Sequence, residues 1–204
     1  MNDTRDSYDL VAANYASATR HELAARPLDR ALLAAFAELA IGPVVDFGCG
    51  PGHVTAHLHQ LGLDVSGLDT SAGMIEVARA AYPEVRFEVG SAPPADARLG
   101  GLAAFYSIIH TPPGELQSLF SAFATALAPA SPLLLAFQVG SDDRRHISSG
   151  FGHEVSLDAY RFDPENVVVA LEAAGFEMLS RTIREPADPS EKGQRAYLLA
   201  VRNE

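Results

Sequence analysis

Apolar and polar positions recur along this chain with two periods. Residues 27–40 carry apolar side chains every three or four positions, start with a proline suited to a first helical turn, and end before Gly42 and Pro43. This spacing predicts a helix with one face on a core. Residues 44–47 form a short, mainly apolar run before a glycine-rich stretch, which is typical of a buried strand.

The two periods continue to alternate as far as the carboxyl end. They predict further strands at residues 64–68, 85–89, 102–109, 132–139, 176–183 and 195–201. They predict further helices at residues 53–61, 72–81, 116–127 and 164–174. Strands that alternate with helices form right-handed crossover units, so we expect an α/β fold in which helices cover both faces of a mostly parallel sheet. This architecture is a three-layer sandwich.

Composition indicates one globular domain over residues 1–204, because 48% of the residues are hydrophobic and 20% are charged. The long stretches without periodicity are residues 139–163, expected to be a loop, and residues 184–194. The net charge of −11 argues against a nucleic-acid partner, whose phosphates need lysine and arginine. No membrane partner is expected, and the oligomeric state stays open.

The single cysteine excludes an intramolecular disulfide. The amino terminus is polar and acidic where a secretory signal is basic and then apolar. We therefore expect a cytoplasmic protein. No group of cysteines and histidines has the spacing of a zinc site, so no metal is expected.

The segment VVDFGCGPGH, residues 44–53, joins a strand to a helix through Gly48, Gly50 and Gly52. Glycines let a backbone turn tightly and approach a ligand closely, and a helix amino terminus offers free N–H groups to an anion. A dinucleotide-binding loop reads G-x-G-x-x-G, whereas this loop reads G-x-G-x-G and follows Asp46. The alternative of a simple tight turn accounts poorly for three glycines in five residues.

Two acidic residues indicate the kind of ligand. Asp69 ends the next strand, 19 residues after Gly50, where an acid accepts hydrogen bonds from ribose hydroxyls; its alternative role is to cap the following helix. A carboxylate at Asp46 opposes a diphosphate and suits a positively charged nucleoside, which favours S-adenosylmethionine over NAD. Alternatively, Asp46 is buried and binds the backbone N–H groups of the loop.

These residues resemble the first motif and the ribose-binding acid of the class I S-adenosylmethionine-dependent methyltransferases. FEVGSA, residues 87–92, resembles the segment that borders the adenine, although Ser91 stands where the family often has an acid. SYDLVAANYAS, residues 7–17, resembles the amino-terminal segment of small-molecule methyltransferases, whose tyrosines close over the donor. The resemblance implies a Rossmann-like, seven-stranded sheet in the order 3-2-1-4-5-7-6 with strand 7 antiparallel.

The resemblance also implies a donor site covered by helices within residues 1–40. The residues expected to contact S-adenosylmethionine are Tyr8, Tyr15, Arg20, Asp46, Gly48, Cys49, Gly50, His53, Asp69, Thr70, Met74, Ser91, Ala92 and Tyr106.

Methyl transfer from a sulfonium needs mainly an aligned nucleophile, and a base is needed when the acceptor loses a proton. His110 follows the fourth predicted strand and is the candidate for this base or for acceptor contact; alternatively it binds the loop backbone. His146, His153 and Tyr160 lie in residues 139–163 and are expected to cover a small-molecule acceptor. The rival functions are a protein that binds the donor without methyl transfer and an NAD-linked oxidoreductase.

Overall fold

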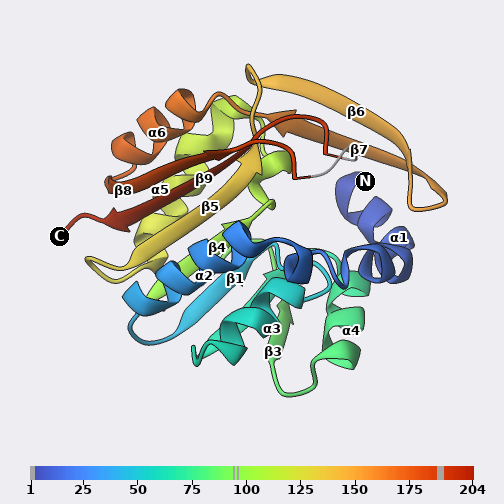
Figure 1. The fold of residues 1–204 in the computed structure, drawn as a ribbon, viewed down its shortest axis with the longest axis horizontal. Helices are drawn as coiled ribbons and strands as arrows, with labels where there is room; N and C mark the ends of the chain where they lie inside the picture. Colours follow the sequence, from blue (N-terminus) through green and yellow to red (C-terminus); the bar gives the residue numbers. More distant parts are fainter. Residues whose placement is uncertain (1–2, 94, 96, 188–190) are drawn as a thin grey trace.

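A seven-stranded sheet runs through the centre of the computed structural model, which describes residues 3–93, 95, 97–187 and 191–204. The strand order is β3-β2-β1-β4-β5-β9-β8 (Figure 1). All neighbours are parallel except β9, which is antiparallel to both β5 and β8. The strands are β1 (Val44–Phe47), β2 (Val65–Asp69), β3 (Arg86–Val89), β4 (Gly101–Phe105), β5 (Pro132–Gln138), β8 (Phe176–Arg184) and β9 (Arg195–Arg202). The predicted order is confirmed, because the last two strands are numbered 8 and 9 only through an additional hairpin.

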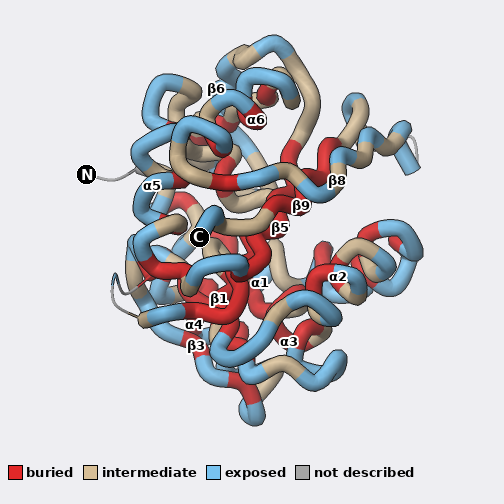
Figure 2. Tube along the Cα trace, turned by 90° about the vertical axis from the view of Figure 1, so that its left-hand side faces the viewer, coloured by how far each residue is buried: buried red, intermediate tan, exposed pale blue. Residues whose placement is uncertain are grey.

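Side chains that alternate along the central strands divide the core between two helical layers. Leu134 of β5 packs with residues of α2 (Pro27–Leu39) and α3 (His53–Gln60). Its neighbours Leu133 and Leu135 pack with residues of α5 (Leu116–Ala126) and α6 (Pro164–Ala173). Figure 2 shows the buried positions gathered along β1, β5 and β9 at the centre. The remaining layer helix, α4 (Ala72–Ala81), packs on β2 and β3.

Helix α1 (Asp3–Thr19), at the amino terminus, lies outside the two helical layers. It contacts α4 on one side and β7 on the other. Short 3₁₀ helices, η1 (Leu23–Ala25), η2 (Ile108–His110) and η3 (Pro113–Glu115), occupy the connections. No helix in the described ranges is long and apolar enough to cross a membrane.

The expectation of an irregular loop at residues 139–163 is wrong. The segment forms an antiparallel hairpin of β6 (Asp143–Gly150) and β7 (His153–Arg161). Phe151 and Gly152 make its two-residue turn, with φ of 53° and 83°, as the mirror-image hairpin turns require. Because phenylalanine is unusual at positive φ, the residue type at position 151 did not indicate a hairpin turn. The Phe151 ring packs on Tyr15 with ring centroids 4.8 Å apart, a contact that favours this conformation.

The predicted strand at residues 102–109 is too long. Strand β4 ends at Phe105 and the chain turns at Tyr106, whose φ is 60°. The apolar residues after the turn belong to η2, where Ile108 is fully buried. An uninterrupted apolar run therefore concealed the end of the strand.

The glycine loop approaches the end of β4 very closely. Gly48 and Gly50 have φ of 67° and 52°, in the left-handed region. A Cβ atom at Gly48 would lie 2.3 Å from Ser107 Cβ, whereas one at Gly50 would meet nothing within 4 Å. Gly48 is thus required both by its backbone conformation and by the lack of space, and Gly50 only by its conformation.

We expect Gly48→Ala to lower the free energy of unfolding more than Gly50→Ala does. Both variants place an L side chain in the left-handed region, at a cost of about 1–2 kcal/mol, and Gly48→Ala adds overpacking of about 1–3 kcal/mol. Urea unfolding of the two variants beside the wild type measures the difference. Equal losses would show that Ser107 does not confine the loop.

Candidate active site

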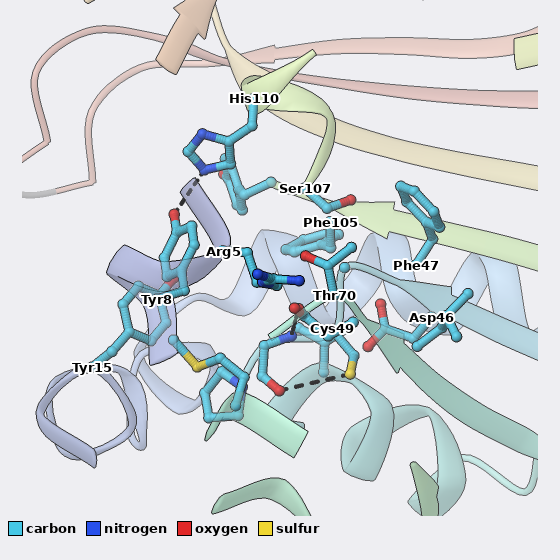
Figure 3. A pocket seen from close by; sticks show the side chains of 18 of the residues that line it. Arg5, Tyr8, Tyr15, Asp46, Phe47, Cys49, Thr70, Phe105, Ser107 and His110 are labelled. Atoms are coloured by element: carbon cyan, nitrogen blue, oxygen red, sulfur yellow. Dashed lines mark hydrogen bonds between the residues drawn. The ribbon is translucent and has the colours of Figure 1, made fainter. Parts of the chain in front are cut away.

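A cavity of about 350 Å³ lies where the carboxyl ends of β1, β2 and β4 meet the inner side of α1 (Figure 3). In parallel sheets, ligands bind at this end of the strands, beside the first strand. The lining residues are Thr4, Arg5, Tyr8, Tyr15, Asp46, Phe47, Gly48, Cys49, Gly50, Pro51, His53, Val54, Leu68, Asp69, Thr70, Met74, Gly90, Phe105, Tyr106, Ser107, His110 and Thr111.

The cavity collects most of the residues that the sequence predicts at the site. They come from α1, the glycine loop, β2 and α4, and the segment after β4. The predicted residues that line it are Tyr8, Tyr15, Asp46, Gly48, Cys49, Gly50, His53, Asp69, Thr70, Met74, Tyr106 and His110. Their contacts with a ligand stay predictions.

Three residues predicted to contact the donor are not among the lining residues. Arg20, which follows the last turn of α1, lines a neighbouring hollow of about 420 Å³ between α1 and α4 that shares Pro51 and His53 with the cavity. Ser91 and Ala92 are exposed after β3, although Gly90 directly before them does line the cavity.

The three acceptor candidates of residues 139–163 do not line the cavity either, because the hairpin holds them elsewhere. His146 is half exposed and lies 2.9 Å from a carboxylate oxygen of Asp158. His153 contacts the amide of Asn14 on α1 at 3.3 Å. Tyr160 stacks on Phe162 with ring centroids 6.3 Å apart. The hairpin reaches the cavity through α1 and His110 instead.

Sequence reasoning missed several lining residues, among them Arg5, Phe105, Ser107 and Thr111. Arg5 precedes Tyr8 by three residues, so helical spacing alone places the two on one face of α1. The other three flank predicted site residues at the end of β4. These signals were present in the sequence, but no motif marks them.

Asp69 fixes the glycine loop to the end of β2. Its Oδ2 accepts the backbone N–H of Gly50 at 2.8 Å, and its Oδ1 accepts that of Ser71 at 2.9 Å. The helix cap of α4 is Ser71, which accepts the N–H of Met74, so Asp69 supports the cap without being it. Burial raises the pKa of Asp69, and its backbone hydrogen bonds oppose this effect.

Asp46 is almost fully buried and lines the deep side of the cavity. Its Oδ2 accepts a hydrogen bond of 2.7 Å from the hydroxyl of Thr55 on α3, so its side-chain partner is a helix residue and not the loop backbone. Burial raises the pKa of Asp46 to about 7, with the hydrogen bond from Thr55 opposing and the charge of Asp69 adding to the rise. A positive charge in the cavity would lower this pKa again.

Tyr8, His110 and Asp158 form a chain of hydrogen bonds. His110 Nδ1 lies 2.7 Å from the carbonyl oxygen of Asp158 and must donate to it. In the neutral imidazole, Nε2 therefore accepts the hydroxyl of Tyr8, also at 2.7 Å (Figure 3). Burial lowers the pKa of His110 and raises that of Tyr8, so both groups are neutral near pH 7.

Polar contacts on both sides hold α1 over the cavity. Asp9 accepts hydrogen bonds from the hydroxyl of Ser71 and the N–H of Gly73, at 2.6 and 2.8 Å. Across α1, Ser7 accepts the N–H of Ser156 in β7 at 2.9 Å. Helix α1 is therefore bound to both α4 and the hairpin, and Tyr8 lies between these attachments.

Tyr106 is held on the cavity wall by a buried polar network. Its hydroxyl lies 2.9 Å from that of Tyr197, which donates to Asp29 at 2.7 Å. Because the Tyr197 proton points to Asp29, Tyr106 is the donor to Tyr197. Arg184 also donates to the Tyr197 hydroxyl, at 3.0 Å. This network compensates the unfavourable backbone conformation of Tyr106.

The lining carries charges of both signs. Asp46 and Asp69 are its acids, and Arg5 is the one lysine or arginine among the lining residues that the structure describes. Within the described ranges, no three His, Cys, Asp or Glu side chains are grouped so as to hold a metal ion.

Comparison with known sequences identifies the glycine loop as part of a known domain. Residues 44–130 match the model of a methyltransferase domain family. Trans-aconitate 2-methyltransferase of Rhizobium meliloti (strain 1021) is 32% identical over 124 residues, which are 58% of this chain and 47% of that protein. The corresponding protein of Sinorhizobium medicae (strain WSM419) is 33% identical over the same length. The chain thus spans about half the length of these curated relatives.

Solved structures share the fold over almost the whole chain. The 1,6-didemethyltoxoflavin-N1-methyltransferase of Burkholderia thailandensis, with S-adenosylhomocysteine bound, has a TM-score of 0.76 at 19% identity and covers 98% of this chain and 87% of that one. The DhpI–SAH complex has the same score at 22% identity and covers 98% and 96%. Over residues 44–130 this chain is thus similar to a methyltransferase domain family, and over almost its whole length it has the fold of a solved methyltransferase.

Proposed function

We propose that this protein transfers a methyl group from S-adenosylmethionine to a small-molecule acceptor. The observation that carries the proposal is the meeting of the glycine loop, the buried Asp46, the partly buried Asp69 and the Tyr8–His110 pair in one cavity. The relatives named as methyltransferases support it independently.

The residues of the cavity fit this donor. Each oxygen of Asp69 makes one hydrogen bond and keeps acceptor capacity for a ribose hydroxyl. Within the described residues, Ser107 Oγ and His53 Nδ1 are buried without a hydrogen-bond partner, as expected of a wall completed by a polar ligand. Met74 and Leu68 offer apolar contact for the adenine. When bound, S-adenosylmethionine supplies an electrophilic methyl group on a positively charged sulfur.

Asp46 gives the cavity its preference for a cation. Near neutral pH the empty site holds Asp46 partly protonated, and a positive charge nearby stabilises the carboxylate. A pyrophosphate would instead favour the neutral, protonated form of Asp46, and no charge attraction between ligand and Asp46 would remain. The alternative of an NAD-linked oxidoreductase is disfavoured on this ground.

The Tyr8–His110 pair is suited to accept a proton from the acceptor. The Tyr8 proton points to His110, so the oxygen lone pairs of Tyr8 are available to a protic nucleophile in the cavity. As the nucleophile attacks, its proton passes to Tyr8 and the Tyr8 proton passes to His110 Nε2. The carbonyl of Asp158 stabilises the resulting imidazolium through Nδ1. His110, expected to act directly, thus acts through Tyr8.

The class of acceptor also follows from charge. A net charge of −11 opposes nucleic acid, which leaves a small molecule as our proposal. Trans-aconitate is the first acceptor to test, because the curated relatives carry that name; its carboxylates attack already ionised, so the Tyr8–His110 pair is tested with a protic acceptor. The cytoplasmic location and the lack of a membrane partner stay predictions from the sequence.

Three titrations and one transfer assay test the proposal. The protein is titrated with S-adenosylmethionine, S-adenosylhomocysteine and NAD, and is then incubated with methyl-labelled donor and candidate acceptors. We expect both adenosyl compounds to bind and NAD to bind far more weakly, with label appearing in an acceptor. Donor binding without transfer to any acceptor would favour a binding protein, and tight NAD binding alone would favour the oxidoreductase.

Affinity for S-adenosylmethionine should rise with pH up to about 7 and then level off. Below that pH, Asp46 is protonated in the empty site and must lose its proton to face the cation, because its pKa is about 7 without ligand and lower with it. We expect Kd at pH 6 to exceed Kd at pH 7 by about three- to tenfold. Calorimetry in buffers of different ionisation enthalpy measures the proton released.

Asp46→Asn should abolish this dependence. Thr55→Val removes the hydrogen bond that lowers the pKa of Asp46, so the rise in affinity should move to higher pH. If Asp46→Asn retained the wild-type pH profile, another group would be responsible for it.

Tyr8→Phe and His110→Gln should each lower kcat for an acceptor that loses a proton, by about 10²- to 10⁴-fold. Each removes one member of the proton-accepting pair, so the two losses should not add in the double variant. The acid limb of the kcat profile, due to protonation of His110, should also disappear. Steady-state assays at saturating donor check this expectation.

Tyr82→Phe is the matched control, since Tyr82 ends α4 outside this cavity and its change should leave kcat unaltered. If Tyr8→Phe kept the kcat of the wild type, the proposed proton transfer through Tyr8 and His110 would be contradicted. Such a result would indicate an acceptor that attacks already ionised, as a carboxylate does.

A further inference from the structure

We infer that Arg5 binds a negatively charged group of the acceptor, and that the acceptor is therefore a small acid, carrying a carboxylate or phosphate apart from its reacting atom. The inference rests on the proposed methyl transfer, and it adds the substrate class and a residue that selects it.

The position of Arg5 places it beside the reacting groups. It lies in the first turn of α1, three residues before Tyr8, and both residues line the cavity. Figure 3 shows its side chain extending into the middle of the cavity, between Tyr8 and Thr70. An acceptor whose nucleophile reaches Tyr8 therefore passes within reach of Arg5.

Most of the hydrogen-bonding capacity of Arg5 is available. Its Nε and Nη2 donate to one oxygen of the adjacent Asp6, at 3.1 and 3.0 Å. Both side chains of this pair are about half exposed, and such pairs are worth about 0–1 kcal/mol. An anion can therefore displace Asp6 from Arg5 at little cost, or bind the Arg5 N–H groups that Asp6 leaves available.

Two threonines of the lining offer further hydrogen-bond donors to an anion. Thr4 lies next to Arg5 on α1, and Thr111 follows His110 on the opposite wall; both line the cavity. In the part of the chain that the structure describes, neither hydroxyl has a hydrogen-bond partner. The two acids of the lining, Asp46 and Asp69, repel an anion, and among the described lining residues Arg5 is the lysine or arginine that attracts one.

The carboxylate of the donor is better accommodated elsewhere. In S-adenosylmethionine the ammonium and carboxylate groups share one carbon, so they must bind close together. The acid that suits the ammonium is Asp46, at the end of β1, and α3 begins at His53 in the same loop. Free N–H groups in the first turn of a helix bind carboxylates. This leaves Arg5, on the other wall, for the acceptor.

The test measures anion binding to protein already saturated with S-adenosylhomocysteine, so that the donor site is filled. The probes are trans-aconitate, citrate and inorganic phosphate at equal concentration, titrated into the wild type and into Arg5→Gln, Arg5→Lys and Arg86→Gln. We expect at least one anion to bind the wild type and to bind Arg5→Gln about tenfold more weakly. Arg5→Lys should retain part of the affinity.

Arg86→Gln is the matched control, because Arg86 is exposed, lies outside this cavity and, like Arg5, is paired with an exposed carboxylate, that of Asp64; it should bind as the wild type does. The trimethyl ester of trans-aconitate, which has no charge, should not bind. Lack of binding by all three anions, or undiminished binding to Arg5→Gln, would overturn the inference.

A second comparison separates the acceptor from the donor. S-adenosylhomocysteine and 5′-methylthioadenosine, which lacks the amino-acid tail, are titrated into the wild type and Arg5→Gln. We expect Arg5→Gln to bind both as the wild type does. A loss confined to S-adenosylhomocysteine would assign Arg5 to the donor carboxylate and refute the acceptor role. Failure of the wild type to bind either compound would refute the proposed function itself.

Discussion

The two hydrogen bonds of Asp69 to Gly50 and Ser71 are the constraint on which the site depends. They join the glycine loop after β1 to the turn after β2, so the floor of the cavity is fixed before any ligand enters. Gly48, pressed against Ser107, joins the same loop to the segment after β4. Three neighbouring strands are thereby connected at their carboxyl ends, where the ligand binds in folds of this class.

Helix α1 turns this floor into an enclosed site. Asp9 binds it to α4 and Ser7 binds it to β7, so the hydroxyl of Tyr8 meets His110 at the cavity wall. The hairpin, which contributes no lining residue within the described chain, acts on the site indirectly: its Asp158 carbonyl sets the tautomer of His110. The glycine loop thus serves to bind the donor. Helix α1 and the segment after β4 together accept the proton, through Tyr8 and His110, and α1 also recognises the anion, through Arg5.

Much of the fold was predictable because its signals are local. Periodicity and glycine or proline breaks predicted the seven strands along the chain, and the family resemblance supplied their order in the sheet. The local signals failed where a tertiary contact opposed the local preference. Phe151 adopts a hairpin turn that its residue type disfavours, and Tyr106 ends β4 inside an apolar run. In both cases packing against distant aromatic rings, Tyr15 and Tyr197, outweighs the local conformational cost.

The sequence by itself determined the glycine loop, its two acids and the class of ligand, because covalent spacing along one strand–loop–helix unit places them together. Only the tertiary structure decided which arginine enters the cavity, Arg5 instead of Arg20, because that depends on where α1 docks. It also paired Tyr8 with His110, 102 residues apart, and brought the pKa of Asp46 to about 7. Burial and long-range pairing are properties of the assembled core, and no local pattern encodes them.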